Sequence, residues 1–287
     1  MTRRSAIVLM GILVVLDALA WSDIALGSFG KRLELFFFDV GQGDSEMIAM
    51  PGNVKLLIDG GPANGKAAAS LGEVLPWGDG YIDAIMVSHL ELDHFGGLMD
   101  VLKRYDVGAF IYNGRTADSE SAKELMHELK RKRISVVAVG EGDSITYEGN
   151  TVHIISAERN MTAKGNANES AIVARFAGGG VTALFTGDIG SKTEQRLIHE
   201  GNMRADILKI PHHGSKFSST KELLQAVRPR IAVIEVGKNS YGHPTKEVLD
   251  RIAAVGAQLL RTDRRGMIRM TVEKGIRYIV ASTKKEL

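Results

Sequence analysis

Continuous apolar runs alternate with amphipathic stretches along most of this 287-residue chain. Runs such as Leu33–Asp39, Val181–Phe185 and Ile231–Val236 are short and mostly apolar, which is typical of strands buried on both faces. Stretches such as Lys246–Val255 repeat apolar side chains at helical spacing. The alternation predicts an α+β protein in which sheets and helices pack in layers.

The order of these elements, with no linker or internal repeat between them, predicts one continuous domain composed of two halves. The predicted strands are Leu33–Asp39, Ser45–Met50, Val54–Ile58, Ile82–Val87, Ser135–Val139, Thr151–Ser156, Ala171–Phe176, Val181–Phe185, Asp206–Ile210, Ile231–Val236, Gln258–Arg261 and a closing hairpin of Met267–Val272 and Arg277–Val280. The predicted helices are Lys66–Leu75, Phe95–Tyr105, Ser121–Lys132, Ser191–Glu200, Thr220–Val227 and Lys246–Val255.

Metal-binding side chains are dense directly after the run Ile82–Val87. Residues 88–97 read Ser-His-Leu-Glu-Leu-Asp-His-Phe-Gly-Gly, so His89, Glu91, Asp93 and His94 fall within six positions. Imidazole and carboxylate are ligands of zinc, manganese and iron. If a strand ends here, its alternate residues His89, Glu91 and Asp93 project to one side and converge.

Three further apolar runs end in the same kind of side chain. Asp188 follows Val181–Phe185, His212 and His213 follow Asp206–Ile210, and His243 follows Ile231–Val236. In layered α/β folds, ligands bind at the carboxyl ends of the strands. A single histidine of this kind is more often an ordinary surface or core residue, but the four together predict one metal site.

The motifs also occur in a recognisable order: Phe38-Asp-Val-Gly-Gln-Gly-Asp-Ser45, Leu57-Ile-Asp-Gly-Gly61, residues 88–97, Asn168-Glu-Ser170, Thr186-Gly-Asp188, Pro211-His-His-Gly-Ser215 and Tyr241-Gly-His-Pro244. From about Leu33 onward the chain resembles the metallo-β-lactamase superfamily, and within it the ComEC-like hydrolase domains of competence proteins. The resemblance implies a four-layer αββα sandwich, one or two metal ions at its rim, and hydrolysis by a metal-bound hydroxide.

Two departures from the wider superfamily concern the metal ligands. Glu91 stands where the second histidine of the motif is expected, and Asn168-Glu-Ser170 occupies the stretch in which another histidine is missing. One metal position has therefore exchanged imidazole for oxygen, which favours manganese or magnesium there, or an empty position. We expect zinc or manganese, one or two ions, bound by ligands from the set His89, Glu91, Asp93, His94, Asp188, His212 and His243.

Catalytic roles follow from the same set of residues. Asp93 is expected to orient the nucleophile or protonate the leaving group, and His213 and Ser215 to stabilise the oxyanion. Which of His212, His213 and His243 binds metal stays open. Substrate contacts are expected from Asp44, Asn168, Ser170 and Lys216.

The resemblance suggests a phosphodiester or nucleic-acid substrate, such as single-stranded DNA, and a link to DNA uptake. Related members cleave lactones, thioesters or phosphorylcholine esters. The alternative is a catalytically degraded binding module that keeps the fold. No Gly-x-Ser-x-Gly motif and no cysteine nucleophile is present, so covalent catalysis has little support.

The amino-acid composition excludes few classes of function. A formal net charge of +2 is too small to indicate nucleic-acid binding by itself. Because the chain has no cysteine, any metal must be bound by histidine, carboxylate and water. We expect a monomer.

The N-terminal segment predicts export from the cytoplasm. Arg3 and Arg4 precede the apolar run Ala6–Leu16, and Ala18-Leu-Ala20 has the form of a cleavage site. We therefore expect a signal peptide or signal anchor over residues 1–30 and a hydrolase domain over 31–287. Membrane association is expected only through the N-terminal segment. A cytoplasmic protein with an apolar leader is the alternative.

Overall fold

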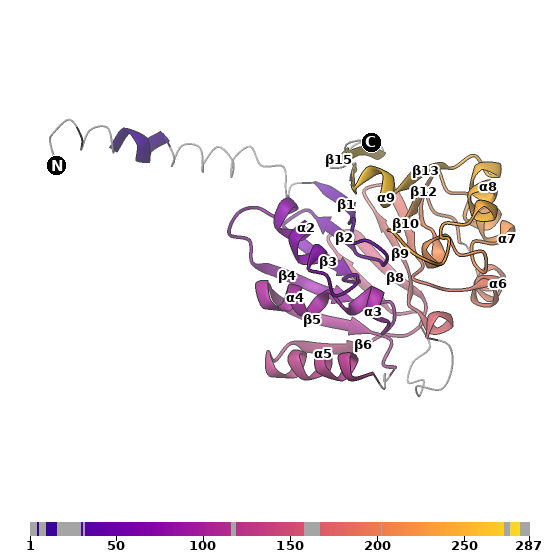
Figure 1. Cartoon of the computed structure of the whole chain (residues 1–287), viewed down its shortest axis with the longest axis horizontal. Coiled ribbons are helices and arrows are strands. Elements are labelled where there is room, and N and C mark those ends of the chain that lie inside the picture. Colours follow the sequence, from indigo (N-terminus) through magenta and orange to yellow (C-terminus); the bar gives the residue numbers. More distant parts are fainter. Residues whose placement is uncertain are drawn as a thin grey trace.

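The computed structural model describes residues 5, 10–15, 30, 32–115, 119–157, 167–201, 203–272 and 276–281 (Figure 1). Most of the expected signal segment, including Arg3, Arg4 and Ala18-Leu-Ala20, lies outside these residues. Within the described residues, no helix is both long enough and apolar enough to span a membrane.

The strands form two mixed sheets. The first sheet has the order β15-β14-β1-β2-β3-β4-β5-β6 and the second has the order β13-β12-β11-β10-β9-β8-β7. The strands of the first sheet are β1 (Leu33–Phe37), β2 (Glu46–Met50), β3 (Val54–Ile58), β4 (Tyr81–Met86), β5 (Asp106–Tyr112), β6 (Ser135–Ala138), β14 (Met267–Val272) and β15 (Ile276–Ala281). Those of the second are β7 (Ser144–Tyr147), β8 (Asn150–Ser156), β9 (Val173–Gly178), β10 (Val181–Phe185), β11 (Ile207–Lys209), β12 (Ile231–Ile234) and β13 (Gln258–Arg261).

Each sheet contains a group of parallel strands, and the expected metal ligands follow the carboxyl ends of these strands. Strands β3 to β6 pair in parallel in the first sheet, and β10 to β13 pair in parallel in the second. The remaining pairs in both sheets are antiparallel. The carboxyl ends of β4, β10, β11 and β12 therefore lead into the loops that carry the expected ligands.

Helices cover the outer faces of both sheets. The covering helices are α2 (Lys66–Val74), α4 (Leu98–Arg104), α5 (Glu120–Arg131), α6 (Ser191–Glu200), α7 (Lys221–Val227) and α8 (Lys246–Ala254). Shorter elements are α3 (Leu92–Phe95), α9 (Thr262–Arg265) and the 3₁₀ turns η1 (Asn168–Ser170) and η2 (Pro211–Gly214). Figure 1 shows α2, α4 and α5 outside the first sheet and α6, α7 and α8 outside the second.

Three hydrophobic clusters correspond to the three contacts between the four layers. One lies between the sheets and includes Phe37, Ile48 and Phe185. A second packs α2, α4 and α5 on the first sheet, and a third packs α6, α7 and α8 on the second. Burial of each sheet on both faces explains why its strands are continuous apolar runs. The expected four-layer αββα sandwich is confirmed.

The helix expected over Phe95–Tyr105 is present as α4, but it begins three residues later than expected, and a separate short helix, α3, precedes it. The Gly97 N–H donates to Gly61 O at 2.8 Å, and Asp93 O accepts from Asp44 N at 3.2 Å. These bonds to distant loops replace the helical bond between Gly97 and Asp93. The helix is therefore interrupted where it meets the loops that follow β1 and β3.

Strands β5 and β7 were not predicted from the sequence. The side chains of β7 alternate between exposed and half-buried, so this segment carries little of the apolar signal that marks the other strands. The expected closing hairpin is present as β14 and β15, with residues 273–275 outside the described part of the chain.

Gly97→Ala should destabilise the protein. A Cβ at this position would lie 2.1 Å from Gly60 O, a backbone atom that cannot move without displacing the loop after β3. Overpacking of this kind costs about 1–3 kcal/mol. Chemical denaturation measures the effect, with Gly80→Ala as the control because a Cβ there meets nothing within 4 Å. Equal midpoints for the two variants would contradict the close approach.

Candidate metal centre

Side chains from both sheets converge at the rim. Asp93 and His94 belong to α3 beyond β4, Asp188 follows β10, and His213 lies in η2 beyond β11. One ligand atom from each of these four residues lies within 4.8 Å of the others. His94 Nε2 is 3.4 Å from Asp188 Oδ2, and His213 Nε2 is 3.5 Å from both Asp188 Oδ2 and Asp93 Oδ2. We call these four residues the rim cluster.

The polar atoms of the rim cluster are unsatisfied within the protein. His94 Nε2, His213 Nε2 and Asp188 Oδ1 are buried and have no hydrogen-bond partner, and the same is true of the neighbouring His89 Nε2. Buried polar atoms without partners are costly, and several at one point are rare. A divalent cation would satisfy them together. Two imidazoles and two carboxylates are a ligand set that suits zinc or manganese.

The second nitrogen of each imidazole in the cluster has a fixed partner. His94 Nδ1 is 2.8 Å from Asp59 Oδ2, and His213 Nδ1 is 2.9 Å from Glu235 O. Such partners orient a ligating ring and direct its other nitrogen toward the ion. Nε2 is therefore the free nitrogen in both His94 and His213.

Asp59 is a functional residue that the sequence reasoning missed. Its carboxylate also accepts from Ser88 N at 2.7 Å and from Ser88 Oγ at 2.6 Å, which ties the loop after β3 to the loop after β4. Its φ of 55° is left-handed, a conformation that aspartate adopts more readily than most residues. The motif Leu57-Ile-Asp-Gly-Gly61 contained the signal, because an aspartate directly follows an apolar strand.

His89 and Glu91 lie in the loop between β4 and α3 rather than on a strand. Strand β4 ends at Met86, and Glu91 is the residue before α3, so strand alternation does not bring His89, Glu91 and Asp93 together. That hypothesis is wrong. The His89 ring lies 4.1 Å from the His94 ring and is buried, whereas the Glu91 side chain is 43% exposed and its Oε2 is 3.9 Å from His89 Nε2.

His212 and His243 lie on the open side of the rim cluster. His212 Nε2 is 3.7 Å from Asp188 Oδ2, and the His212 and His243 rings are 5.7 Å apart. Consecutive left-handed residues, His212 and His213 with φ of 51° each, turn the chain sharply after β11 and send the two rings in different directions. His213 thus points into the cluster while His212 faces outward.

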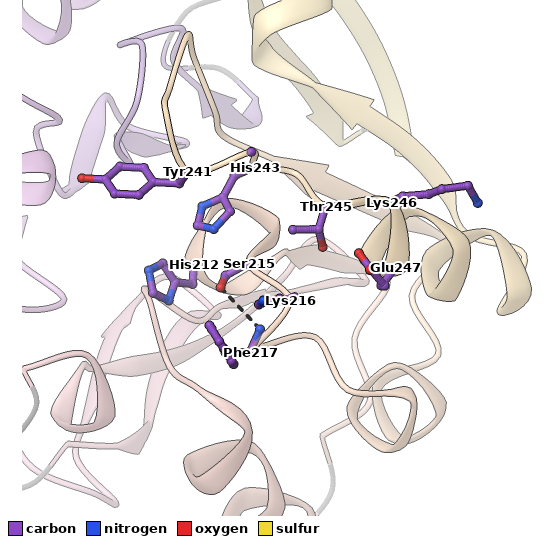
Figure 2. A pocket seen from close by; sticks show the side chains of 10 residues that line it. His212, Ser215, Lys216, Phe217, Tyr241, His243, Thr245, Lys246 and Glu247 are labelled. Atoms are coloured by element: carbon purple, nitrogen blue, oxygen red, sulfur yellow. Dashed lines mark hydrogen bonds between the residues drawn. The ribbon is translucent and has the colours of Figure 1, made fainter.

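A pocket of about 590 Å³ opens beside the cluster (Figure 2). Its wall comes from η2, the loop after β12 and the start of α8. It is lined by His212, Ser215, Lys216, Phe217, Tyr241, Gly242, His243, Thr245, Lys246 and Glu247. Figure 2 shows His212 and His243 turned toward each other at its inner side.

Some of the residues expected to contact substrate line the pocket, and others do not. Ser215 and Lys216 line the pocket. Ser170 is buried, its Oγ accepts from Arg115 Nη1 at 2.7 Å and donates to Ala167 O at 2.8 Å, and Asn168 begins the same turn. Asp44 is fully buried behind the cluster. Of these residues, only Ser215 and Lys216 line the pocket.

Lys209 is the second functional residue missed by the sequence reasoning. Its ammonium group is completely buried, forms an ion pair with Asp44, donates to Gly187 O at 3.0 Å and lies 3.8 Å from Asp188 Oδ1. Lysine is almost never fully buried unless it is paired. Burial lowers the lysine pKa, but Asp44 and Asp188 outweigh burial and raise it, so Lys209 stays charged.

Two more carboxyl groups lie behind Lys209, on Glu46 and Glu235. Both side chains are buried, and Glu235 Oε1 accepts from Ser45 N at 3.1 Å. Burial and the nearby Asp44 raise the pKa of Glu46 to about 8. Burial and Glu46 likewise raise the pKa of Glu235 well above its usual value. Protons on this pair reduce the negative charge that Lys209 must balance.

Charges within the rim cluster stabilise one another. Burial raises the pKa of Asp93, but the His213 imidazole 3.5 Å away and the charge of His94 lower it to about 2. Burial lowers the pKa of His213, but Asp188 and Asp44 raise it to about 10. Without an ion the imidazoles are therefore protonated, and binding of a cation must release their protons.

Comparison with known proteins agrees with this geometry. The sequence model of the Metallo-beta-lactamase superfamily matches residues 39–237. The chain is 29% identical to ComE operon protein 3 of Bacillus subtilis (strain 168) over 253 residues, which are 82% of this chain and 32% of that protein. It is 31% identical to Competence protein ComA of Neisseria gonorrhoeae over 241 residues, which are 83% of this chain and 32% of that protein. The chain spans about a third of the length of these relatives.

Solved structures share the fold. The metallo-beta-lactamase fold protein YhfI from Bacillus subtilis superposes with a TM-score of 0.54 and 12% identity, covering 81% of this chain and 97% of that one. Igni18, a metallo hydrolase from the archaeon Ignicoccus hospitalis, superposes with a TM-score of 0.54 and 15% identity, covering 82% and 98%.

Lys209→Met should destabilise the protein strongly, because Asp44 would remain buried without its cation. Breaking a buried pair by removing one partner costs about 3–5 kcal/mol. Lys103→Met is the matched control, since Lys103 is 69% exposed in its pair with Asp100 and such pairs contribute about 0–1 kcal/mol. Urea unfolding measures both. A loss for Lys209→Met no larger than that of the control would refute the role of the buried pair.

Glu46→Gln should flatten the dependence of stability on pH. The folded pKa of about 8 exceeds the usual 4.5, so stability from the protonated carboxyl is complete below about pH 4.5 and is lost as the pH rises through 8. The wild-type loss should exceed about 1.4 kcal/mol, the equivalent of one pKa unit. Unfolding measured from pH 5 to 9 tests this, with the exposed Glu73→Gln as control. Parallel curves for wild type and Glu46→Gln would contradict it.

Proposed function

Because the chain belongs to the metallo-β-lactamase superfamily, as its motifs predict, we propose that it is a metal-dependent hydrolase that cleaves phosphodiesters, a nuclease of the ComEC-like type. The observation that carries the proposal is the convergence of buried, unpaired ligand atoms in the rim cluster, open on one side to a pocket. Buried polar atoms without partners are rare, so several at one point indicate a ligand that satisfies them.

Asp93, His94, Asp188 and His213 would hold one ion, zinc or manganese. A bound divalent ion supplies a water molecule of lowered pKa and a positive charge that polarises the electrophile. His213, first considered for the oxyanion, fits the ligand role better because its Nε2 faces Asp188 and Asp93. The other expected ligands, His89 with Glu91 and His212 with His243, lie beside the rim cluster rather than in it.

The remaining residues would orient the substrate and move protons. Asp93, with its carboxylate 35% exposed and its pKa of about 2, stays ionised and can orient the attacking water by accepting its hydrogen bond. Burial lowers the pKa values of His212 and His243, so both rings are neutral near pH 7 and can donate to a non-bridging phosphate oxygen. Lys216 and Ser215 supply further donors at the pocket.

A phosphodiester is favoured over a neutral ester by charge and by the relatives. Two lysines, Lys216 and Lys246, line the pocket beside the cluster, with Glu247 as the lining carboxylate. The similar proteins named for competence, and Recombination protein 2 of Haemophilus influenzae at 28% identity, support a nucleic-acid substrate and a link to DNA uptake.

A binding module is the second candidate. The observation in its favour is the half-exposed Glu91, together with Asn168 where the wider superfamily has imidazole, because both weaken one metal position. The rim cluster keeps a full set of four ligand atoms, so a hydrolase with one ion remains the better reading. Export and the expected monomer, like the domain limits 1–30 and 31–287, stay predictions.

Asp93→Ala and His94→Ala should each abolish hydrolysis and lower metal content, because each removes a ligand of the cluster. His89→Ala should cost less activity, since His89 lies outside the four closest ligand atoms. The measurement is metal analysis of the purified full chain, followed by turnover of bis-p-nitrophenyl phosphate, single-stranded DNA and a lactone with manganese or zinc.

His199→Ala is the matched control, because this exposed imidazole on α6 is remote in the fold from the cluster and should leave activity and metal content unchanged. Wild-type turnover by Asp93→Ala on the best substrate would disprove the mechanism. A wild-type protein that neither binds an ion nor gains thermal stability from manganese or zinc would favour the binding module.

A further inference from the structure

Two exposed aromatic rings flank the pocket beside the rim cluster. Phe217 is 69% exposed and Tyr241 is 73% exposed, and both line the pocket (Figure 2). Only four aromatic side chains are strongly exposed in the described part of the chain, and the other two are Trp77 and Tyr81. Isolated exposed apolar residues are ordinary, but two at one polar pocket indicate a binding surface.

Both rings stand on backbone that is held in place. Asn239 Oδ1 accepts from Tyr241 N at 3.1 Å and from His243 N at 3.0 Å, while Asn239 Nδ2 donates to Gly237 O and His243 O at 2.9 Å. Phe217 O accepts from Ser191 N at 3.0 Å, which fixes this loop to the start of α6. The rings are therefore presented by organised loops, and little ordering is needed when a ligand binds.

A short series of rings connects Tyr241 to the rim cluster. The Tyr241 and His243 ring centroids are 5.7 Å apart, the His243 and His212 centroids are also 5.7 Å apart, and His212 Nε2 is 3.7 Å from Asp188. A flat group stacked on Tyr241 thus lies two rings from the ligand atoms. Its attached phosphate could reach the cluster while the flat group stays at the rim.

Charge next to the rings favours an anion. Lys216 forms no ion pair among the described residues, and its Nζ lies 5.0 Å from the Phe217 ring centroid. Lys246 Nζ is 2.6 Å from Asp250 Oδ2, so Lys216 is the cation free to meet a phosphate. A flat ring joined to a phosphate is the chemistry of a nucleotide, and the pocket volume lies within the roughly 300–1,000 Å³ of ligand sites.

We propose that Phe217 and Tyr241 form a stacking rim for unpaired nucleobases, with Lys216 on the backbone phosphate, and that they select single-stranded over double-stranded nucleic acid. The inference rests on the proposed function where it concerns cleavage of nucleic acid. It does not rest on that function where it concerns binding of nucleic acid. Base faces are free in a single strand and can stack on aromatic rings. In a duplex the base faces are covered by neighbouring base pairs, so they cannot stack on Phe217 and Tyr241.

Binding of a labelled single-stranded oligonucleotide of about 12 nucleotides, near the usual size of such sites, tests the rim. Phosphorothioate linkages keep the strand intact, and fluorescence anisotropy with the full chain and manganese gives the dissociation constant. Phe217→Ala and Tyr241→Ala should each raise the dissociation constant about 5- to 150-fold, the fold-change that corresponds to loss of one stacked base. Tyr241→Phe keeps the ring and should bind nearly as wild type does.

An abasic strand of the same length and a duplex of the same sequence separate stacking from backbone contact. Wild type should bind both more weakly than the single strand, and the alanine variants should lose that preference. Trp77→Ala is the control, since this aromatic is fully exposed but does not line the pocket. Melting temperatures near that of wild type would show that the variants fold.

Unchanged affinity in both alanine variants overturns the stacking rim, and so does an equal loss on base-bearing and abasic strands. Turnover of bis-p-nitrophenyl phosphate distinguishes failure of the stacking rim from failure of the proposed function. Turnover by wild type without oligonucleotide binding would refute the rim and keep the hydrolase. Ring-dependent binding without turnover of any phosphodiester would support the rim and refute the hydrolase.

Discussion

The two sheets meet at the metal-binding rim through the buried ammonium of Lys209, which comes from β11 and pairs with Asp44 in the loop after β1. The same ammonium lies near Asp188, a ligand candidate of the second sheet. Its single positive charge allows several carboxylates to be buried close together, because unpaired buried charges would otherwise be too costly. Protons on Glu46 and Glu235 relieve the remaining negative charge. The close burial of these carboxylates at the rim therefore depends on the ion pair of Lys209 and Asp44.

Close backbone contact complements this electrostatic constraint. The loops after β1, β3 and β4 approach so closely that Asp93 O accepts from Asp44 N, and a side chain at Gly97 would collide with Gly60. Short α3 holds Asp93 and His94 at this junction, and its length is set by the hydrogen bonds it makes to the loops rather than by helix propensity. Hydrophobic layers on either side of each sheet make the junction rigid.

The rim cluster and the pocket lie side by side. The cluster of Asp93, His94, Asp188 and His213 is largely buried and unsatisfied, which suits a tightly held cation. The adjoining pocket is open, with exposed rings and a lysine. Under the proposed function, this arrangement suits a long substrate, because only the bond to be cleaved has to reach the cluster.

The layered fold and most of the ligand candidates could be predicted from the amino-acid sequence. Strands buried on both faces are continuous apolar runs, and the carboxyl ends of parallel strands share one edge, so local pattern was sufficient for Asp188 and the histidines. The folded structure was needed to show which histidine enters the cluster and to identify Asp59 and Lys209. Neighbouring His212 and His213 differ through a left-handed turn, and the ion pair of Lys209 spans 165 positions. Ring direction and long-range charge pairing leave no periodic trace in a sequence.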